Sequence, residues 1–252
     1  TSNASGNWNN SSVWTPTGIP SASDNVTITS GKTININVTS SCSSLTINTG
    51  GTVNFSNVIS CTISGTLSVS GTITGSSTGS FTTFRMEIPS GVIANIGRSS
   101  ISVTDSLIIS GSYNITNVTG TKTFANLLLK TGGDWTNTGS AAAPFTITGD
   151  MIFYDGSSIK GNNTSNITIN GDLICKAGIG YADIGRCNLT VNGLTEIYGS
   201  LRFIITTGGT KTFNGGITIN PEGELDNTVG LDLFINGNIQ NNGSWNDASG
   251  NV

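Results

Sequence analysis

Five glycines recur every 22 residues in the second half of the chain, and this repeat limits the possible folds more than any other feature. They are Gly149, Gly171, Gly193, Gly215 and Gly237, and an asparagine precedes all but the first. A fixed period of this size is typical of a solenoid, whose coils cannot bury their apolar faces alone. We interpret each Asn-Gly step as a corner, because glycine accepts a positive φ, and expect the asparagines to bond from coil to coil.

Apolar residues fall into columns with the same period. One column consists of Ile147, Ile169, Val191, Phe213 and Ile235, and another of Met151, Leu173, Thr195, Ile217 and Ile239. A further column of Ile159, Tyr181, Phe203 and Leu225 is also expected to point inward. Apolar residues two apart indicate strands, and the breaks between such pairs indicate corners. Each coil should therefore contain about three short strands.

The same signature continues upstream with looser spacing, and we place one coil there around Phe84. The expected fold is all-β: a single-stranded parallel β-helix with three sheets and about 10–11 coils of roughly 19–23 residues. We expect one domain over 1–252, with an N-terminal cap segment at 1–30 and the most regular repeats at 145–252.

The N-terminal segment carries a recognisable pattern: Gly6-Asn-Trp8, Trp14, Pro20 and then Asp24-Asn-Val26-Thr-Ile28. It resembles the opening segment of bacterial secreted or cell-surface parallel β-helix repeat proteins of the adhesin-like kind. This resemblance covers about the first thirty residues and implies tryptophans that cover the first coil, as a solenoid requires. Together with the crossover rule it implies a right-handed helix. It also implies export, and a role in adhesion or polysaccharide contact.

The C-terminal end is expected to fall inside a coil. Gly133-Asp-Trp135 and Gly243-Ser-Trp245 repeat one pattern, and their tryptophans are five periods apart. In that register the next coil would begin just after Val252. We therefore expect a chain truncated within a repeat and a longer parent protein.

Composition excludes several functions. The chain has ten Lys and Arg residues and a net charge of −4, which gives no electrostatic footprint for nucleic acid. No apolar run approaches the ~20 residues of a membrane helix, so we predict no membrane insertion. Without any histidine, neither a Ser-His nor a Cys-His nucleophile can form, and a zinc site is improbable. We predict no catalytic and no metal-binding residues.

The four cysteines form two close pairs in the sequence. Two disulfides, Cys42 with Cys61 and Cys175 with Cys187, would suit an exported protein. Four buried, inert thiols are the equally weighted alternative.

Tyr154 and Tyr198 share an outward column with Lys176 between them, which suggests a carbohydrate-binding strip. Ordinary surface tyrosines are the simpler alternative. Asp150 and Asp172 lie one coil apart in another column, and their oxygens could recruit Ca²⁺, the one cofactor we consider. A purely structural role of these acids is the alternative.

Threonines form a second outward column: Thr146, Thr168, Thr190 and Thr212. A flat, regular threonine array on a solenoid resembles ice-binding proteins. The high β propensity of threonine explains the same column without any ligand.

We therefore expect a non-catalytic, extracellular β-helix module of a larger surface or secreted protein. It would be monomeric and serve display or adhesion, with a polysaccharide or cell-surface glycan as its partner. The alternatives are a polysaccharide-active enzyme of β-helix type and an ice-binding solenoid that uses the threonine array.

Overall fold

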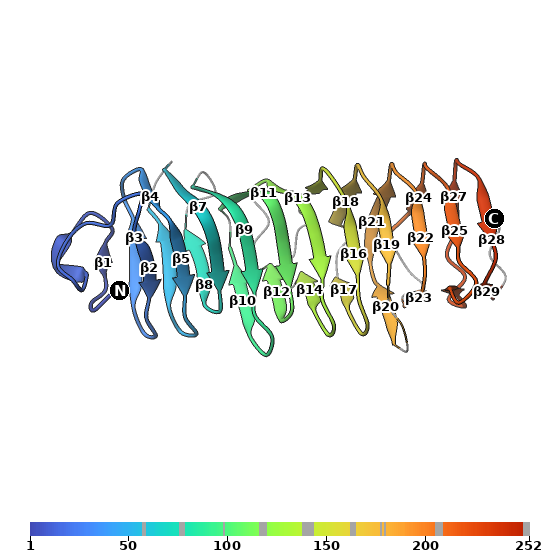
Figure 1. Cartoon of the computed structure of the whole chain (residues 1–252), viewed down its shortest axis with the longest axis horizontal. Helices are drawn as coiled ribbons and strands as arrows, with labels where there is room; N and C mark the ends of the chain where they lie inside the picture. The colour runs from blue at the N-terminus through green and yellow to red at the C-terminus, as the bar shows by residue number, and fades with distance from the viewer. Residues whose placement is uncertain are drawn as a thin grey trace.

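The chain winds into a β-solenoid in which each coil lies on the one before it, with the two termini at opposite ends (Figure 1). The computed structural model describes residues 1–56, 59–75, 79–97, 99–115, 120–137, 144–161, 165–176, 178, 180–204 and 209–248. All pairings between the strands are parallel, apart from one isolated antiparallel bridge near the N-terminus. The expected all-β parallel solenoid is confirmed.

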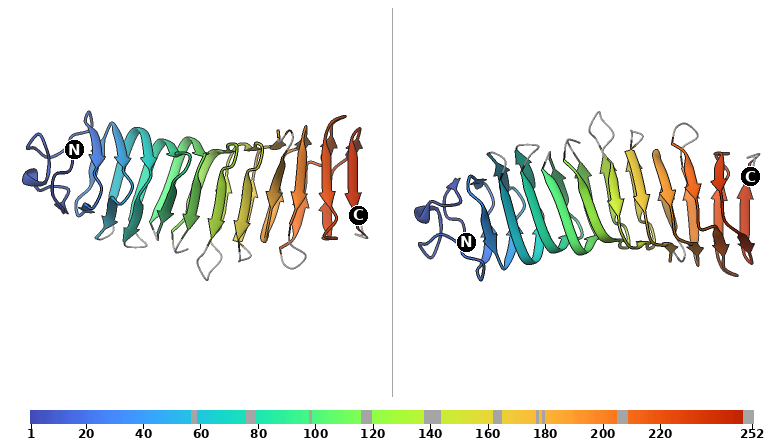
Figure 2. Two further views of the ribbon diagram at one scale, coloured as in Figure 1. Left: turned by 90° about the horizontal axis from the view of Figure 1, so that it is seen from below. Right: turned by 90° about the horizontal axis from the view of Figure 1, so that it is seen from above.

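Each coil has three faces (Figure 2). Face 3 is a twelve-stranded sheet in the described residues: β1 (Gly6–Asn7), β3 (Thr33–Ile36), β6 (Thr52–Phe55), β8 (Thr72–Gly75), β10 (Ile93–Ile96), β12 (Ser112–Ile115), β14 (Asp134–Asn137), β17 (Ser158–Gly161), β20 (Tyr181–Ile184), β23 (Ser200–Phe203), β26 (Glu224–Asn227) and β29 (Ser244–Asp247). A three-residue 3₁₀ turn, η1 (Ser11–Val13), is the one helical element described, and no described helix could cross a bilayer.

Faces 1 and 2 share four long strands that run around the corner between them: β7 (Ser60–Val69), β9 (Ser80–Ile88), β11 (Ser100–Ile109) and β13 (Lys122–Leu129). The remaining strands of face 1 are β4 (Ser40–Cys42), β15 (Phe145–Ile147), β18 (Ser165–Ile169), β21 (Cys187–Val191), β24 (Lys211–Phe213) and β27 (Leu233–Ile235). Those of face 2 are β2 (Asn25–Ile28), β5 (Ser44–Ile47), β16 (Met151–Phe153), β19 (Leu173–Cys175), β22 (Thr195–Ile197), β25 (Ile217–Ile219) and β28 (Ile239–Asn241).

The corner between faces 1 and 2 changes along the solenoid. In β11 it is a register shift between Val103 and Ser106, so the strand continues through it. From Gly149 onwards the corner carries the periodic glycines and separates β15 from β16. The five-glycine repeat thus describes the half of the solenoid in which this corner breaks the strand.

The periodic glycines are needed for space. We expected them to adopt positive φ, and this reason is wrong, because none of the five is among the glycines with positive φ. A Cβ on Gly193 would collide with the carbonyl oxygen of Gly171, and one on Gly215 with the carbonyl oxygen of Gly193. The Gly193 N–H donates to that same Gly171 oxygen at 3.0 Å. The backbone of each coil therefore sits directly on the next, and any side chain would separate them.

The asparagines before these glycines form the expected ladder. The Nδ2 of Asn192 donates to Oδ1 of Asn170 at 3.0 Å, Asn214 donates to Asn192 at 2.8 Å, and Asn236 donates to Asn214 at 2.7 Å. An amide inside the stack both donates and accepts a hydrogen bond, and these bonds offset the conformational entropy lost when the side chain is held in one orientation.

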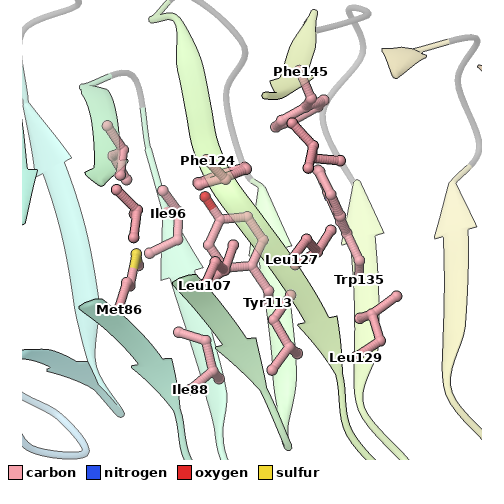
Figure 3. Close-up of a cluster of buried hydrophobic side chains, with 14 of the residues drawn as sticks. Met86, Ile88, Ile96, Leu107, Tyr113, Phe124, Leu127, Leu129, Trp135 and Phe145 are labelled. Carbon is pink, nitrogen blue, oxygen red and sulfur yellow. The ribbon is translucent and has the colours of Figure 1, made fainter. Parts of the chain in front are cut away.

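The inward side chains of all three faces fill one continuous core. Ile147, Ile169, Val191 and Phe213 are completely buried, as their column predicts. An aromatic cluster lies in the middle of the solenoid (Figure 3). Its rings meet edge to face, with centroids 5.8 Å apart for Tyr113 and Trp135, 6.2 Å for Phe124 and Trp135, and 4.4 Å for Trp135 and Phe145.

Two aromatic side chains cover the N-terminal end of this core. Trp8 and Trp14 are buried, and their rings meet edge to face at 5.3 Å. The Nε1 of Trp14 donates to the Trp8 carbonyl at 2.9 Å, which satisfies the indole inside the apolar cap.

One expected core position is wrong. Ile184, and not Tyr181, pairs with Ile159 and Phe203 on face 3, because the coil between β17 and β20 does not keep the 22-residue period. Tyr181 is partly exposed, and the guanidinium of Arg202 lies 4.1 Å from its ring centroid. The coil expected around Phe84 is present as β9, whose inward residues include Phe81 and Met86, and Phe84 itself is 49% exposed.

The predicted disulfides are also wrong. Cys42, Cys61, Cys175 and Cys187 are buried thiols that form no disulfide. Cys42 lies opposite Ile63, two residues beyond Cys61 on the neighbouring strand, and the Cys42 and Cys61 thiols contact each other through a hydrogen bond. Cys175 points inward from face 2 and Cys187 from face 1 of the next coil. Burial raises the pKa of the Cys187 thiol, which keeps it protonated and unreactive.

Two lysines are buried in the core, each within the sequence Gly-Thr-Lys-Thr-Phe. The Nζ of Lys122 donates to the carbonyl oxygens of Ser99 at 2.5 Å and of Gly120 at 3.2 Å. The Nζ of Lys211 makes the same contacts one motif later, to Cys187 at 2.6 Å and Gly209 at 3.3 Å. Each ammonium thus joins the backbone of two adjacent coils. Lys211 is the one polar residue in an inward column of the periodic repeats that otherwise consists of Phe145, Ile167, Leu189 and Leu233.

Burial lowers the pKa of Lys122 from 10.5 to about 8, because the low-dielectric core disfavours its charged form. The charged lysine therefore costs stability below pH 8, and this cost disappears as the pH rises towards 10.5, where the unfolded chain also loses the proton. We predict that, between pH 8 and 10.5, the free energy of unfolding of the wild type rises by up to about 3 kcal/mol relative to that of Lys122→Met. Urea unfolding of both proteins across this range measures the difference, and a constant difference would contradict it.

Candidate functional site

The outward surface of face 2 carries three parallel rows of side chains. In the register of its strands, Leu128 lies opposite Ile152, Ile152 opposite Ile174, and Ile174 opposite Glu196. Residues about 22 apart in the chain are therefore neighbours on the surface. We call the three rows the corner ladder (Asn126, Asp150 and Asp172), the aliphatic ladder (Ile108, Leu128, Ile152 and Ile174) and the Lys/Tyr ladder (Lys130, Tyr154, Lys176 and Tyr198).

The aliphatic ladder occupies the centre of this surface. Its four side chains point outward from β11, β13, β16 and β19 and are partly exposed. Glu87 lies at one end of the row and Glu196 at the other. An apolar row four coils long spans about 14 Å at the spacing of parallel strands. Such a contiguous exposed patch, edged by polar residues, is a feature of binding surfaces.

Each residue of the Lys/Tyr ladder directly follows the last residue of a face 2 strand, where the chain turns towards face 3. The N–H of Tyr154 donates to Leu129, that of Lys176 to Phe153 and that of Tyr198 to Cys175. The Nζ of Lys130 lies 4.3 Å from the ring centroid of Tyr154, a cation–π contact.

Tyr198 ends this ladder and is its most open aromatic, with 48% of its surface exposed. Its hydroxyl donates to Oε1 of Glu196 at 2.9 Å, and this bond raises the pKa of Tyr198. The ring is thereby tied at its polar end while its sides remain open to a ligand.

The corner ladder has a structural role. Oδ1 of Asp150 accepts the backbone N–H of Asp172 at 2.8 Å, and Oδ1 of Asp172 accepts that of Leu194 at 2.8 Å. Asn126 makes the same contact to the N–H of Asp150 at 3.0 Å. The two aspartates are stacked, as expected, and each bonds to the coil that follows. Within the described residues no group of three or more potential metal ligands is found.

A hollow lies at the start of the Lys/Tyr ladder, on the corner between faces 2 and 3. It is lined by Ser110, Gly111, Ser112, Thr131 and Gly132, together with the turn at 90–93. Hydroxyls and backbone groups dominate its wall. The hollow and the ladder form one continuous surface, because Lys130 and Thr131 are adjacent in the chain.

The structure therefore brings Tyr154, Lys176, Tyr198, Asp150 and Asp172 onto one face. Sequence reasoning missed the aliphatic ladder. Its signal was three consecutive apolar residues in a short strand, as in Met-Ile-Phe at 151–153 and Leu-Ile-Cys at 173–175. In a strand that buries one side, the middle residue of such a triplet must face outward.

The threonine array lies on face 1, away from this surface. Thr146, Thr168, Thr190 and Thr212 are paired in direct register, and Thr123 extends the row by one coil. The row ends at Phe234, which lies opposite Thr212 and is 51% exposed. It is flanked by the asparagine ladder, whose amides are already bonded to one another.

The described ion pairs do not include a ladder residue, and the pair of Arg85 and Asp105 adjoins the corner ladder, where Asn126 donates to the Asp105 carbonyl. Arg85 pairs with Asp105 at 3.0 Å, Lys160 with Asp134 at 3.0 Å, and Arg202 with Asp183 at 2.9 Å. The hydrogen bond from Asp183 raises the pKa of Arg202. Each is a one-to-one pair on the outer surface, and none belongs to the three ladders.

A comparison of the chain with known protein families, with curated proteins and with solved structures found no match.

We predict that the corner ladder needs an acceptor oxygen and not a charge. Asp150→Asn keeps Oδ1, as Asn126 does one coil earlier, and should leave stability nearly unchanged. Asp150→Ala leaves the N–H of Asp172 unpaired and should cost about 1–3 kcal/mol. Urea unfolding compares the two variants with the wild type. If Asp150→Asn is as destabilising as Asp150→Ala, the negative charge itself is needed, as it would be for a bound cation.

Proposed function

We propose that this protein is a non-catalytic β-helix module of a larger secreted or cell-surface protein, and that it serves display or adhesion by contacting glycans. The observation that carries the proposal is the alignment of the aliphatic and Lys/Tyr ladders on face 2. The contact surface consists of these two ladders, and the glycan lies along them.

The chemistry of the two ladders supports sugar contact. Sugar rings offer apolar C–H faces and hydroxyl edges, and the surface offers both complements. Ile152 and Ile174 supply apolar area beside the partly exposed rings of Tyr154 and Tyr198. Lys176 and the hydroxyl-lined hollow supply hydrogen-bonding groups. A solenoid also holds these rows rigidly, because each is built on hydrogen-bonded strands.

The non-catalytic assignment is supported by how the nearby acids are used. Asp150 and Asp172 accept backbone hydrogen bonds, and Glu196 accepts a hydrogen bond from the Tyr198 hydroxyl. Acid–base catalysis of glycan cleavage would require convergent acids that are available to the substrate.

We predict that the wild-type protein binds members of a glycan array and that Tyr198→Ala weakens this binding by about 2- to 10-fold. Tyr181→Ala, which removes the same side chain from face 3, serves as the matched control and should not change it. Binding to no glycan at all, or equal loss in both variants, would contradict the proposal. Measurable glycan degradation would favour the enzyme alternative.

Ice binding is the second candidate function, supported by the direct register of Thr146, Thr168, Thr190 and Thr212. A row of hydroxyls and methyls at ~4.8 Å intervals can order water. We predict that this function, if present, produces thermal hysteresis or ice shaping that Thr168→Tyr abolishes. Thr218→Tyr makes the same change on face 2 and should retain it. Absence of hysteresis in the wild type would rule the candidate out.

A further inference from the structure

The Lys/Tyr ladder alternates in charge, and this alternation narrows the kind of glycan that it fits. Lys130 and Lys176 are separated by one tyrosine, so they stand two coils apart. At the spacing of parallel strands this is about 10 Å. A regular pair of positive charges on a chain of net charge −4 is unusual enough to need a reason.

Neither lysine takes part in the ion pairs found in the described residues, which use Arg85, Lys160 and Arg202. Lys176 is exposed, and Lys130 contacts the ring of Tyr154. Both ammonium groups are thus available to an anion from the solvent side.

Three acids beside the two ladders have hydrogen-bond partners. Asp155, next to Tyr154, accepts the N–H of Gly178, and Glu196 accepts the Tyr198 hydroxyl. Asp172 is four residues from Lys176 along the same strand, about 13 Å away, and bonds to Leu194. These contacts hold the carboxylates in place beside the rows, and Lys130 and Lys176 are the two cations of the ladders.

From these observations we propose that face 2 binds a negatively charged polysaccharide in an extended conformation, with its chain parallel to the solenoid axis. This inference rests on the proposed glycan-binding function. In an extended, two-fold polymer of uronic acids, the carboxylates on one edge recur once per disaccharide, a distance of the same order as two coils. Lys130 and Lys176 pair with successive carboxylates on that edge.

The sugar rings between those carboxylates lie over the aliphatic ladder. Leu128, Ile152 and Ile174 form an unbroken apolar row. This row runs beside the line from Lys130 to Lys176 and has the same direction and length as that line. Tyr198 continues the contact beyond Lys176. Glu87 and Glu196 lie at the two ends of the row.

The test compares two probes that share one backbone. These are octamers of β-1,4-linked glucuronic acid and β-1,4-linked gluco-oligosaccharides of the same length, which lack the carboxylates. Calorimetry at low salt should show that the wild type binds the acidic octamer about tenfold more tightly, as two surface ion pairs allow. Added salt should reduce this preference.

The double variant Lys130→Gln/Lys176→Gln should lose the preference and bind both probes with equal affinity. Lys32→Gln/Lys160→Gln removes the same charge away from face 2 and should keep it. Equal affinity of the wild type for both probes, or a preference that survives the face 2 substitutions, would overturn this inference while the glycan-binding proposal stands. If the wild type binds neither these probes nor any other glycan, both fail.

Discussion

The hydrogen bonds between successive coils are the constraint on which the rest of this structure depends. Every strand bonds to the strand one coil earlier, and at the corner between faces 1 and 2 even the turn backbone bonds directly, as Gly193 does to Gly171. This close approach leaves no room for a Cβ, so glycine is required at each period. Because the coils cannot slip, an outward side chain always has the same neighbours. The surface rows are a consequence of the backbone register.

The same constraint explains the two buried lysines. A coil whose backbone is not fully paired leaves carbonyl oxygens in the core, and these need donors. Lys122 and Lys211, each within the sequence Gly-Thr-Lys-Thr-Phe, provide such donors. The asparagine and corner ladders provide bonds at the outer edge. Many polar side chains of this chain therefore form hydrogen bonds between coils. Only polar groups without such a structural bond are candidates for ligand binding. Lys130, Lys176 and Tyr154 belong to that smaller set.

Strict periodicity made the second half of the fold predictable from sequence, and its loss explains the errors. The column from Ile147 to Phe213 is correct because each step is 22 residues. Tyr181 was placed inward because that period was carried through a coil that departs from it, where Ile184 takes the place. The reason for the glycines could not be read from the sequence, since lack of space and positive φ both select glycine. The site was partly visible: Tyr154 and Tyr198 stood out as aromatics, whereas the aliphatic ladder was hidden within apolar strands.

The central claim is that residues 22 apart on the outer surface lie in direct register, and a metal bridge tests it most directly. The chain contains no histidine, so Thr168→His/Thr190→His creates the single histidine pair of the molecule, on adjacent strands of face 1. Nickel at about 100 times its Kd should raise the Tm of the double variant by about 5–10 °C. It should leave both single variants unchanged. A register shifted by one residue would place the two histidines on opposite sides of the sheet, and an unchanged Tm in the double variant would contradict the account.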